Sequence, residues 1–426
     1  MQEQTRRSVL ISQYNPPDKR TYTRYGLKTE YMKRIILFAL LTALSLDVEA
    51  QRLRVDFVGD PQVDNETELG YAQRSIYREL KSRKDLDMVV FLGDLVNDDA
   101  SLLAVSKASL DSLGFPWYSV PGNHDRDMYR GKNKKIRDLE TWKKVIGPAD
   151  TAFYRNGIRF ILMNNVRHSP KGEYEGGFTE SQKVFLDSVL RETPLSYRSV
   201  IATHIPFSHM RGSDSLMTII GKYPSVFFVS GHTHNVSRHT LRQDDRYEEL
   251  IAGASCGTWW RGQVDSKGIP YALQNCGAPR GYFVADFSRK SIDLRYKCVD
   301  ASTEASAFIS VDPETGLRKL YINVFGGHRN GQLKVRIPSG SGRWMQMERT
   351  AEVAPEVTSI IKFNKSLSRE EKKKRGDEII PLRRMKSPHL WVAELPEGLV
   401  IPQSIKIAYE DPMMDFRTRL TINEIR

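Results

Sequence analysis

Four short polar blocks constrain the fold of this chain more than any other feature. In chain order they are Gly59-Asp60-Pro61-Gln62, Gly93-Asp94, Gly122-Asn123-His124-Asp125 and Gly231-His232-Thr233-His234, with the lone His204 before the last block. Each block joins a glycine or proline, which shape tight turns, to Asp, Asn, Gln or His, which can bind a metal. Such scattered blocks can act together only if the fold brings distant turns to one place.

Short apolar runs precede most of these blocks and are typical of buried strands. The runs cover residues 53–58, 88–92, 117–120, 159–163, 199–203 and 226–229. Apolar residues recur at helical spacing over residues 66–81, 102–113 and 180–190, between those strands. Strands that alternate with helices predict an α/β fold, in which a site forms beyond the carboxyl ends of the strands.

The blocks supply enough ligands for two metal ions. The candidates are Asp60, Gln62, Asp94, Asn123, His204, His232 and His234. Mixed imidazole and oxygen ligands favour Mn, Fe, Zn or Co over Ca or Mg. Two ions about 3.5–4 Å apart can activate water and neutralise charge during phosphate ester hydrolysis. We therefore expect a phosphoesterase that acts on mono- or diesters.

The order and content of the blocks resemble the calcineurin-like metallophosphoesterase superfamily over roughly residues 53–300. The resemblance implies a four-layer αββα sandwich, in which helices flank two sheets. It also implies a ligand for each role: Asp60, Gln62 and His234 for the first metal, Asn123, His204 and His232 for the second, and Asp94 as the bridge. His124 would bind neither ion; it would face the substrate and protonate the leaving oxygen or stabilise the transition state as a metal-bridging hydroxide attacks.

Two positions depart from the pattern of that superfamily. Gln62 stands where many members have histidine, and its neutral carbonyl oxygen is a weaker ligand for late transition metals. Many members have an aspartate three residues after the bridging one, where it orients the catalytic histidine. Here that position is Asn97, and Asp98 follows it. The sequence leaves open which of the two orients His124.

The predicted secondary structure changes near residue 300, from alternating strands and helices to mainly strands. Strand-like runs at 317–324, 333–337, 390–395 and 404–409 predict a smaller, mainly β domain over residues 301–426 after a phosphoesterase domain over 51–300. The charged stretch Ser366–Glu378 predicts a solvated loop or an exposed helix. Motifs around Trp259 and Trp391 resemble an exported bacterial subset with such an additional domain. Trp259, Trp260 and Arg261 are candidate substrate contacts, with core packing as the alternative for the tryptophans.

The N-terminal region has the three parts of a secretory signal peptide. Lys33-Arg34 precede an apolar segment at 35–41, and Val48-Glu49-Ala50 form a small-x-small cleavage site. We predict a signal peptide over 32–50, an over-extended start over 1–31, and export to the periplasm or cell exterior. The mature chain would then contain no integral membrane segment. A buried N-terminal helix is the alternative.

Charge and cysteine content leave several alternatives open. The net charge of +12 attracts anions but does not choose among phosphate esters, nucleic acids and anionic lipid. The metal-ligand blocks favour a small phosphorylated substrate; nucleic acid is less favoured, because the sequence shows no continuous basic stripe, but it is not excluded. A nuclease and a binding protein on a phosphoesterase scaffold remain alternative functions. Gly253-Ala254-Ser255-Cys256-Gly257 matches a serine-nucleophile pattern, although no convincing helix follows it. Pairing of Cys256 with Cys276 and the oligomeric state also remain open.

Overall fold

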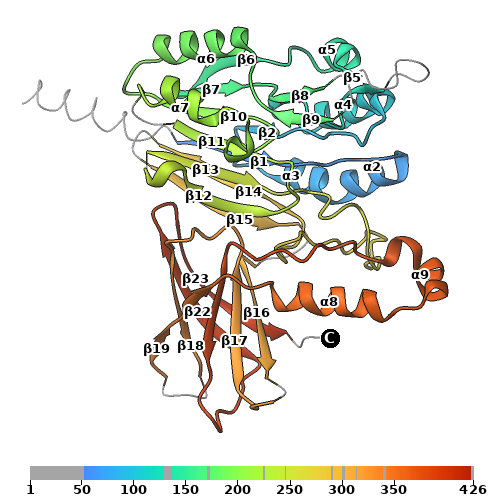
Figure 1. The fold of residues 1–426 in the computed structure, drawn as a ribbon, viewed down its shortest axis with the longest axis vertical. Coiled ribbons are helices and arrows are strands. Elements are labelled where there is room, and N and C mark those ends of the chain that lie inside the picture. The colour runs from blue at the N-terminus through green and yellow to red at the C-terminus, as the bar shows by residue number, and fades with distance from the viewer. Residues whose placement is uncertain are drawn as a thin grey trace, which may run out of the picture. The chain divides into compact units, whose positions relative to one another are not determined.

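The computed structural model describes residues 52–128, 137–169, 173–223, 226–244, 246–288, 291–299, 303–312, 314–338 and 342–423 (Figure 1). The predicted signal peptide, the predicted early start and the predicted domain boundary at 300/301 lie outside these residues. Within the described residues, no helix combines the length and the apolar character needed to cross a membrane.

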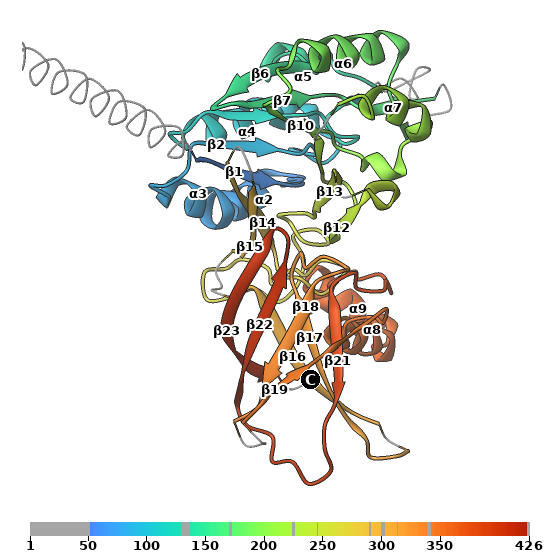
Figure 2. The same cartoon turned by 90° about the vertical axis from the view of Figure 1, so that its left-hand side faces the viewer.

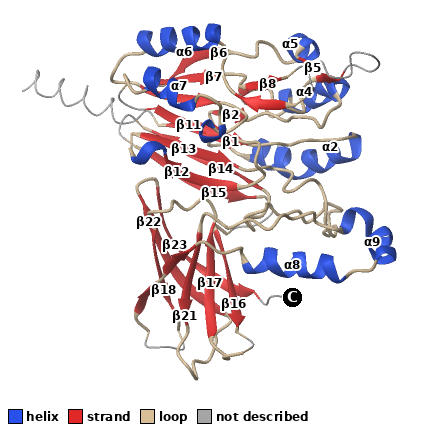
Figure 3. Cartoon of the chain, viewed as in Figure 1, coloured by secondary structure: helices blue, strands red, loops and turns tan. Residues whose placement is uncertain are grey.

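Two mixed sheets form the N-terminal part of the fold (Figure 3). The five-stranded sheet has the order β15 (Ile292–Cys298), β14 (Gly281–Phe287), β1 (Leu53–Val58), β2 (Met88–Phe91) and β3 (Trp117–Ser119). The six-stranded sheet has the order β12 (Val236–Thr240), β13 (Tyr247–Ala252), β11 (Val226–Ser230), β10 (Arg198–Ala202), β7 (Ile158–Leu162) and β6 (Thr151–Arg155). Neighbouring strands are parallel from β1 to β3 and among β7, β10, β11 and β13.

Alternate side chains of each central strand enter different cores. Val55 and Phe57 of β1 pack in the core between the two sheets, whereas Val58 joins the core under the helices. In the six-stranded sheet, Val200 of β10 faces the inner core and Ile201 faces an outer one. Strands buried on both faces read as continuous apolar runs, which is why the sequence revealed them.

Helices cover the outer face of each sheet. The five-stranded sheet carries α2 (Glu66–Ala72), the π-helical turn η1 (Gln73–Tyr77), α3 (Arg78–Ser82), η2 (Ala100–Leu102), α4 (Leu103–Asp111) and α5 (Glu140–Val145). The six-stranded sheet carries α6 (Glu180–Glu192) and α7 (Ser213–Ile220). A capping box between Thr179 and Gln182 fixes the start of α6. This is the calcineurin-like α/β arrangement that the sequence predicted.

Short elements connect these layers. They are the paired strands β4 (Asp127–Met128) and β5 (Arg137–Asp138), the paired strands β8 (Val166–His168) and β9 (Tyr174–Gly176), and the 3-10 turns η3 (Phe207–His209) and η4 (Leu241–Gln243). The helix expected over 66–81 is continuous in extent, but its middle turn is π-helical.

An eight-stranded sheet dominates the C-terminal part, as predicted. Its order is β19 (Trp344–Gln346), β18 (Gln332–Arg336), β22 (Ser404–Asp411), β23 (Met414–Asn423), β16 (Ala305–Val311), β17 (Arg318–Val324), β21 (Leu390–Glu394) and β20 (Glu348–Thr350). The helix α8 (Pro355–Ser366) has no counterpart among the expected elements. The exposed helix α9 (Arg369–Arg375) and the turn η5 (Gly376–Glu378) occupy the charged stretch.

The C-terminal sheet packs directly on the sandwich. Figure 2 shows the turn between β22 and β23 beside β15, where the amide of Leu294 donates to the carbonyl of Met413 at 2.7 Å. Arg238 of β12 is fully buried between Glu248, at 2.7 Å, and Asp411 at the end of β22, at 3.0 Å. Because an unpaired buried charge is costly, this triad fixes how the C-terminal sheet meets the sandwich.

Candidate metal centre

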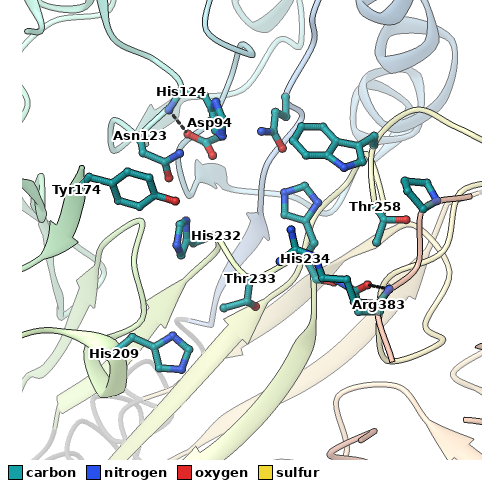
Figure 4. A pocket seen from close by; sticks show the side chains of 14 residues that line it. Asp94, Asn123, His124, Tyr174, His209, His232, Thr233, His234, Thr258 and Arg383 are labelled. Atoms are coloured by element: carbon teal, nitrogen blue, oxygen red, sulfur yellow. Dashed lines mark hydrogen bonds between the residues drawn. The ribbon is translucent and has the colours of Figure 1, made fainter. Parts of the chain in front are cut away.

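The predicted ligands follow strands of both sheets and meet at one edge. Asp60 and Asp94 follow β1 and β2, and His204 and His232 follow β10 and β11. Gln62, Asp94, Asn123, His232 and His234 line a pocket of about 290 Å³ together with His124 (Figure 4). Asp60 and His204 are completely buried. Parallel strands explain the convergence, because their carboxyl ends share one edge of a sheet.

Backbone conformation sets these residues apart from the rest of the chain. Nine non-glycine residues among those described have positive φ angles, and five of the nine are candidate ligands. These five are Asp60, Gln62, Asp94, His232 and His234. The left-handed conformation costs such a residue about 1–3 kcal/mol and persists where surrounding structure enforces it, most often at functional sites. The strain therefore marks these turns as a functional centre.

Glycine and a buried carboxylate hold the turns close together. A Cβ atom on Gly122 would lie 2.0 Å from Oδ1 of Asp94, so only glycine permits this approach. Asp125 is completely buried and accepts hydrogen bonds from the amides of Val96, at 3.1 Å, and Gly122, at 2.8 Å. Asp125 thus ties two ligand-bearing turns and is a structural residue.

His204 presents a ring nitrogen to several other potential ligands. Its Nδ1 lies 2.8 Å from the carbonyl of Leu92, which can only accept, so Nδ1 carries a proton. Its Nε2 faces Oδ2 of Asp94 at 3.2 Å, Oδ1 of Asn123 at 3.0 Å and Nδ1 of His232 at 3.1 Å. Asp94, His204 and His232 together form a group able to hold a metal ion. A metal ion bound between these nitrogen and oxygen atoms could be coordinated by all of them.

Gln62 offers a buried oxygen that lacks a hydrogen-bond partner. Its Oε1 makes no hydrogen bond with the described residues, whereas its Nε2 donates to Oδ1 of Asn97 at 3.2 Å. Asn97 in turn donates to Asp64 at 3.2 Å, which fixes the orientation of both amides. An unpaired buried carbonyl oxygen is costly, and a metal ion in the pocket would pair it.

The protonation states of His232 and His234 suit metal ligands, whereas His204 would have to lose a proton when a cation binds. Burial, assisted by the nearby His204, lowers the pKa of His232 to about 3, and burial lowers the pKa of His234 to about 4. Both rings are therefore neutral, as metal binding requires. Burial lowers the pKa of His204, but Asp94 and Asp60 outweigh burial and raise it to about 9. Burial raises the pKa of Asp60 well above its usual range. A bound cation would stabilise the ionised carboxylate.

The structure distinguishes Asn97 from Asp98. Nδ1 of His124 lies 3.0 Å from Oδ1 of Asp98, whereas Asn97 hydrogen-bonds to Gln62 and Asp64. The amide of His124 also donates to Oδ1 of Asp94 at 2.8 Å. Asp98 is therefore the carboxylate that orients the ring of His124, one residue later than the superfamily pattern suggests.

Only one of the three candidate substrate contacts faces the pocket. Trp259 lines it, with its ring centroid 5.4 Å from that of His234. Trp260 is buried, and its Nε1 donates to the carbonyl of Pro61 at 2.9 Å. Arg261 forms an ion pair of 3.5 Å with Asp377. The expectation is therefore corrected for Trp260, which supports the Asp60 turn from the core, and for Arg261, which lies outside the pocket lining.

Sequence reasoning missed other residues that line the pocket. They are Tyr174, His209, Thr233, Thr258, Asn275, Pro381 and Arg383. His209 lies five residues after His204, which was a weak signal of its position. Asn275, Pro381 and Arg383 stand in irregular segments without a motif, so their sequence context gave no such signal.

The serine and disulfide alternatives find no support in the geometry. Ser255 is completely buried, its Oγ has no hydrogen-bond partner among the described residues, and irregular turns follow it instead of a helix. A serine nucleophile needs an adjacent base and an exposed oxygen. Cys256, Cys276 and Cys298 are all buried and unpaired.

Comparisons with known proteins agree with this geometry. The family described as calcineurin-like phosphoesterase matches residues 53–236, and the family described as the C-terminal part of calcineurin-like phosphoesterase matches residues 249–413. A probable glycerophosphodiester phosphodiesterase of Arcobacter nitrofigilis is 26% identical over 202 residues, which cover 42% of this chain and 71% of that protein. A manganese-dependent ADP-ribose/CDP-alcohol diphosphatase of Arabidopsis thaliana is 26% identical over 241 residues, 42% of this chain and 76% of that protein.

Among solved structures, a 5'-nucleotidase from Candida albicans matches 57% of this chain and 50% of its own chain, with a TM-score of 0.32 and 12% identity.

Replacing Asp94 tests the centre directly. We expect Asp94→Asn to lower metal affinity by about 100-fold or more, because it removes the carboxylate that two ions would share. Elemental analysis after gel filtration of Mn-loaded protein would measure the loss. The control is Asp111→Asn, at the exposed end of α4. Equal metal content in Asp94→Asn and wild type would contradict the assignment.

Proposed function

This chain belongs to the calcineurin-like phosphoesterases, and from that premise we propose that it is an exported enzyme that hydrolyses small phosphate esters with two metal ions. It is a metal-dependent phosphoester hydrolase by family. The observation that carries the finer proposal is the convergence on one pocket, which His124 also lines, of the buried carboxylate of Asp94, the neutral imidazoles of His232 and His234 and the unpaired amide oxygen of Gln62.

Each ion has its own ligands in this proposal. Asp60, Gln62 and His234 would hold the first, Asn123, His204 and His232 would hold the second, and Asp94 would bind both. Possible metal-ligand atoms from Asp94, Asn123 and His232 surround Nε2 of His204 and support the second set. The oxygen of Gln62 that lacks a hydrogen-bond partner supports the first set. The ions would supply Lewis-acid activation of water and charge neutralisation at phosphorus. Their identity is open among Mn, Fe, Zn and Co, and the manganese dependence of the Arabidopsis relative makes Mn the first ion to test.

His124 is the proposed proton donor to the leaving oxygen. Burial lowers its pKa, but Asp98 and Asp94 outweigh burial and raise the pKa overall. Asp98, which contacts Nδ1, favours the charged ring, and a charged imidazole can give a proton to an alkoxide as the ester bond breaks. Asp98 acts through His124 as a positioning residue, because it contacts Nδ1 and leaves the other ring nitrogen for the substrate.

The pocket favours a small substrate. Its volume of about 290 Å³ lies at the lower end for ligand sites. The two relatives are named for a glycerophosphodiester and for ADP-ribose or CDP-alcohols, all small phosphorylated molecules. We therefore propose a small mono- or diester in preference to nucleic acid.

Export rests on the sequence pattern alone. A signal peptide over residues 32–50 would release a chain that begins at Gln51. N-terminal sequencing of the protein recovered from its native host would test this. A mature protein that retains residues 32–50 would sink the proposal.

Metal-dependent turnover is the main test of the proposed function. We expect wild-type protein to hydrolyse p-nitrophenyl phosphate or bis(p-nitrophenyl) phosphate with added Mn, to lose activity in EDTA and to regain it when Mn is restored. Asp94→Asn should lose at least about 100-fold in kcat/KM, because water activation and charge neutralisation both depend on the ions. Release of nitrophenolate measures the rate. Absence of turnover with Mn, Fe, Zn and Co would count against the proposal.

Removing the carboxylate beside His124 tests its role as proton donor. We expect Asp98→Asn to lower kcat by about 10–100-fold while KM and metal content stay within about twofold. The loss should be larger for an alkyl phosphate than for p-nitrophenyl phosphate, because an alkoxide needs the proton more. Asp99→Asn is the matched control, since Asp99 only caps the next turn. Equal losses with both leaving groups would refute proton donation through this pair.

A further inference from the structure

We propose that Arg383, from the C-terminal domain, binds a second phosphoryl group of the substrate, which makes diphosphate compounds the preferred substrate class. The inference rests on the proposed function and names the substrate of that same site. It follows from the segment over residues 377–383, called the strap below, which carries Arg383 to the pocket (Figure 4).

The strap is fastened near its start and its middle. The carbonyl of Asp377 accepts a hydrogen bond from the amide of Gly262 at 2.8 Å. Asn364 of α8 donates to the carbonyl of Ile380 at 2.9 Å. Ile380 is buried, and its side chain lies close to Gly262. Pro381 follows and restricts the backbone further. The strap is therefore a defined part of the site.

Asn275 joins the strap to the metal centre. Its Oδ1 accepts from the amide of Arg383 at 2.9 Å, and its own amide donates to the carbonyl of His234 at 3.1 Å. One residue thus separates Arg383 from His234, a ligand assigned to the first metal. The hydrogen bond between Arg383 and Asn275 is drawn in Figure 4.

The guanidinium of Arg383 is available to a ligand. Arg383 is exposed, and none of the ion pairs among the described residues involves it. The nearby Arg261, in contrast, pairs with Asp377. Among the described residues that line the pocket, Arg383 is the only arginine and there is no lysine. A guanidinium binds phosphate through two parallel hydrogen bonds, which a lysine cannot reproduce.

The charge pattern points to an anion beyond the phosphate that is cleaved. The metal ligands surround the position of the reacting phosphoryl group, where the cations would neutralise its charge. Arg383 adds one further positive charge to the pocket lining, at the end where Asn275 links it to His234. Trp259 lies beside His234 on the same pocket wall. A second phosphoryl group is the anion that suits a bidentate guanidinium, and a carboxylate is the alternative anion that the test separates.

Substrate discrimination provides the kinetic test. Arg383→Ala should raise KM for CDP-choline by about 10–100-fold, and by at least about tenfold more than it raises KM for p-nitrophenyl phosphate. Arg383→Lys should fall between Arg383→Ala and wild type. The matched control is Arg384→Ala, because Arg384 is exposed and absent from the pocket lining. Equal losses on both substrates, or no change on CDP-choline, would overturn the inference.

A binding measurement separates this inference from the proposed function. Calorimetry on Mn-loaded protein would compare methylenediphosphonate, phosphonoacetate and methylphosphonate. We expect wild type to prefer methylenediphosphonate and Arg383→Ala to lose that preference. If wild type shows this pattern but no turnover, the inference stands and the proposed function fails. If phosphonoacetate depends on Arg383 as strongly as methylenediphosphonate, the claim for a phosphoryl group is wrong.

Discussion

The rest of this structure depends on one constraint, which is the burial of two carboxyl groups close to each other. Asp60 and Asp94 lie out of contact with solvent at the edge where two sheets meet, and His204 lies between them. Buried carboxylates need a positive partner, which a protonated His204 supplies in the absence of metal and which bound cations would supply in its place. Residues in the surrounding turns adopt left-handed backbone conformations, which hold this group together. Buried carboxylates and strained backbone are both unfavourable, and here they occur together beside an open pocket. This combination indicates a cation-binding site.

The C-terminal domain takes part in the site as well as in the fold. The buried triad of Arg238, Glu248 and Asp411 fixes the C-terminal sheet against the sandwich. With that sheet in place, α8 holds the strap, and Asn275 fixes the end of the strap beside His234. The pocket thus combines the candidate metal ligands with a wall that belongs to the C-terminal domain.

Local sequence patterns were enough to predict much of the fold. Strands such as β1 and β10 are buried on both faces, so their apolar runs were visible without any partner. The helix α8 was missed because only Pro355 and Val357 of its residues are buried, so few apolar positions mark its packed face. The π-helical turn within 66–81 could not be predicted, because the apolar spacing there still fits an ordinary helix.

The sequence by itself determined the ligand types, their order and the strands they follow, because glycine turns and donor side chains are local properties. Only the tertiary structure decided that Asp98, and not Asn97, orients His124, because one residue along a turn changes which way a side chain points. It also decided that Trp259 faces the pocket while Trp260 supports it from the core. The placement of Arg383 required it too, since two domains must pack before a residue of one can enter the site of the other.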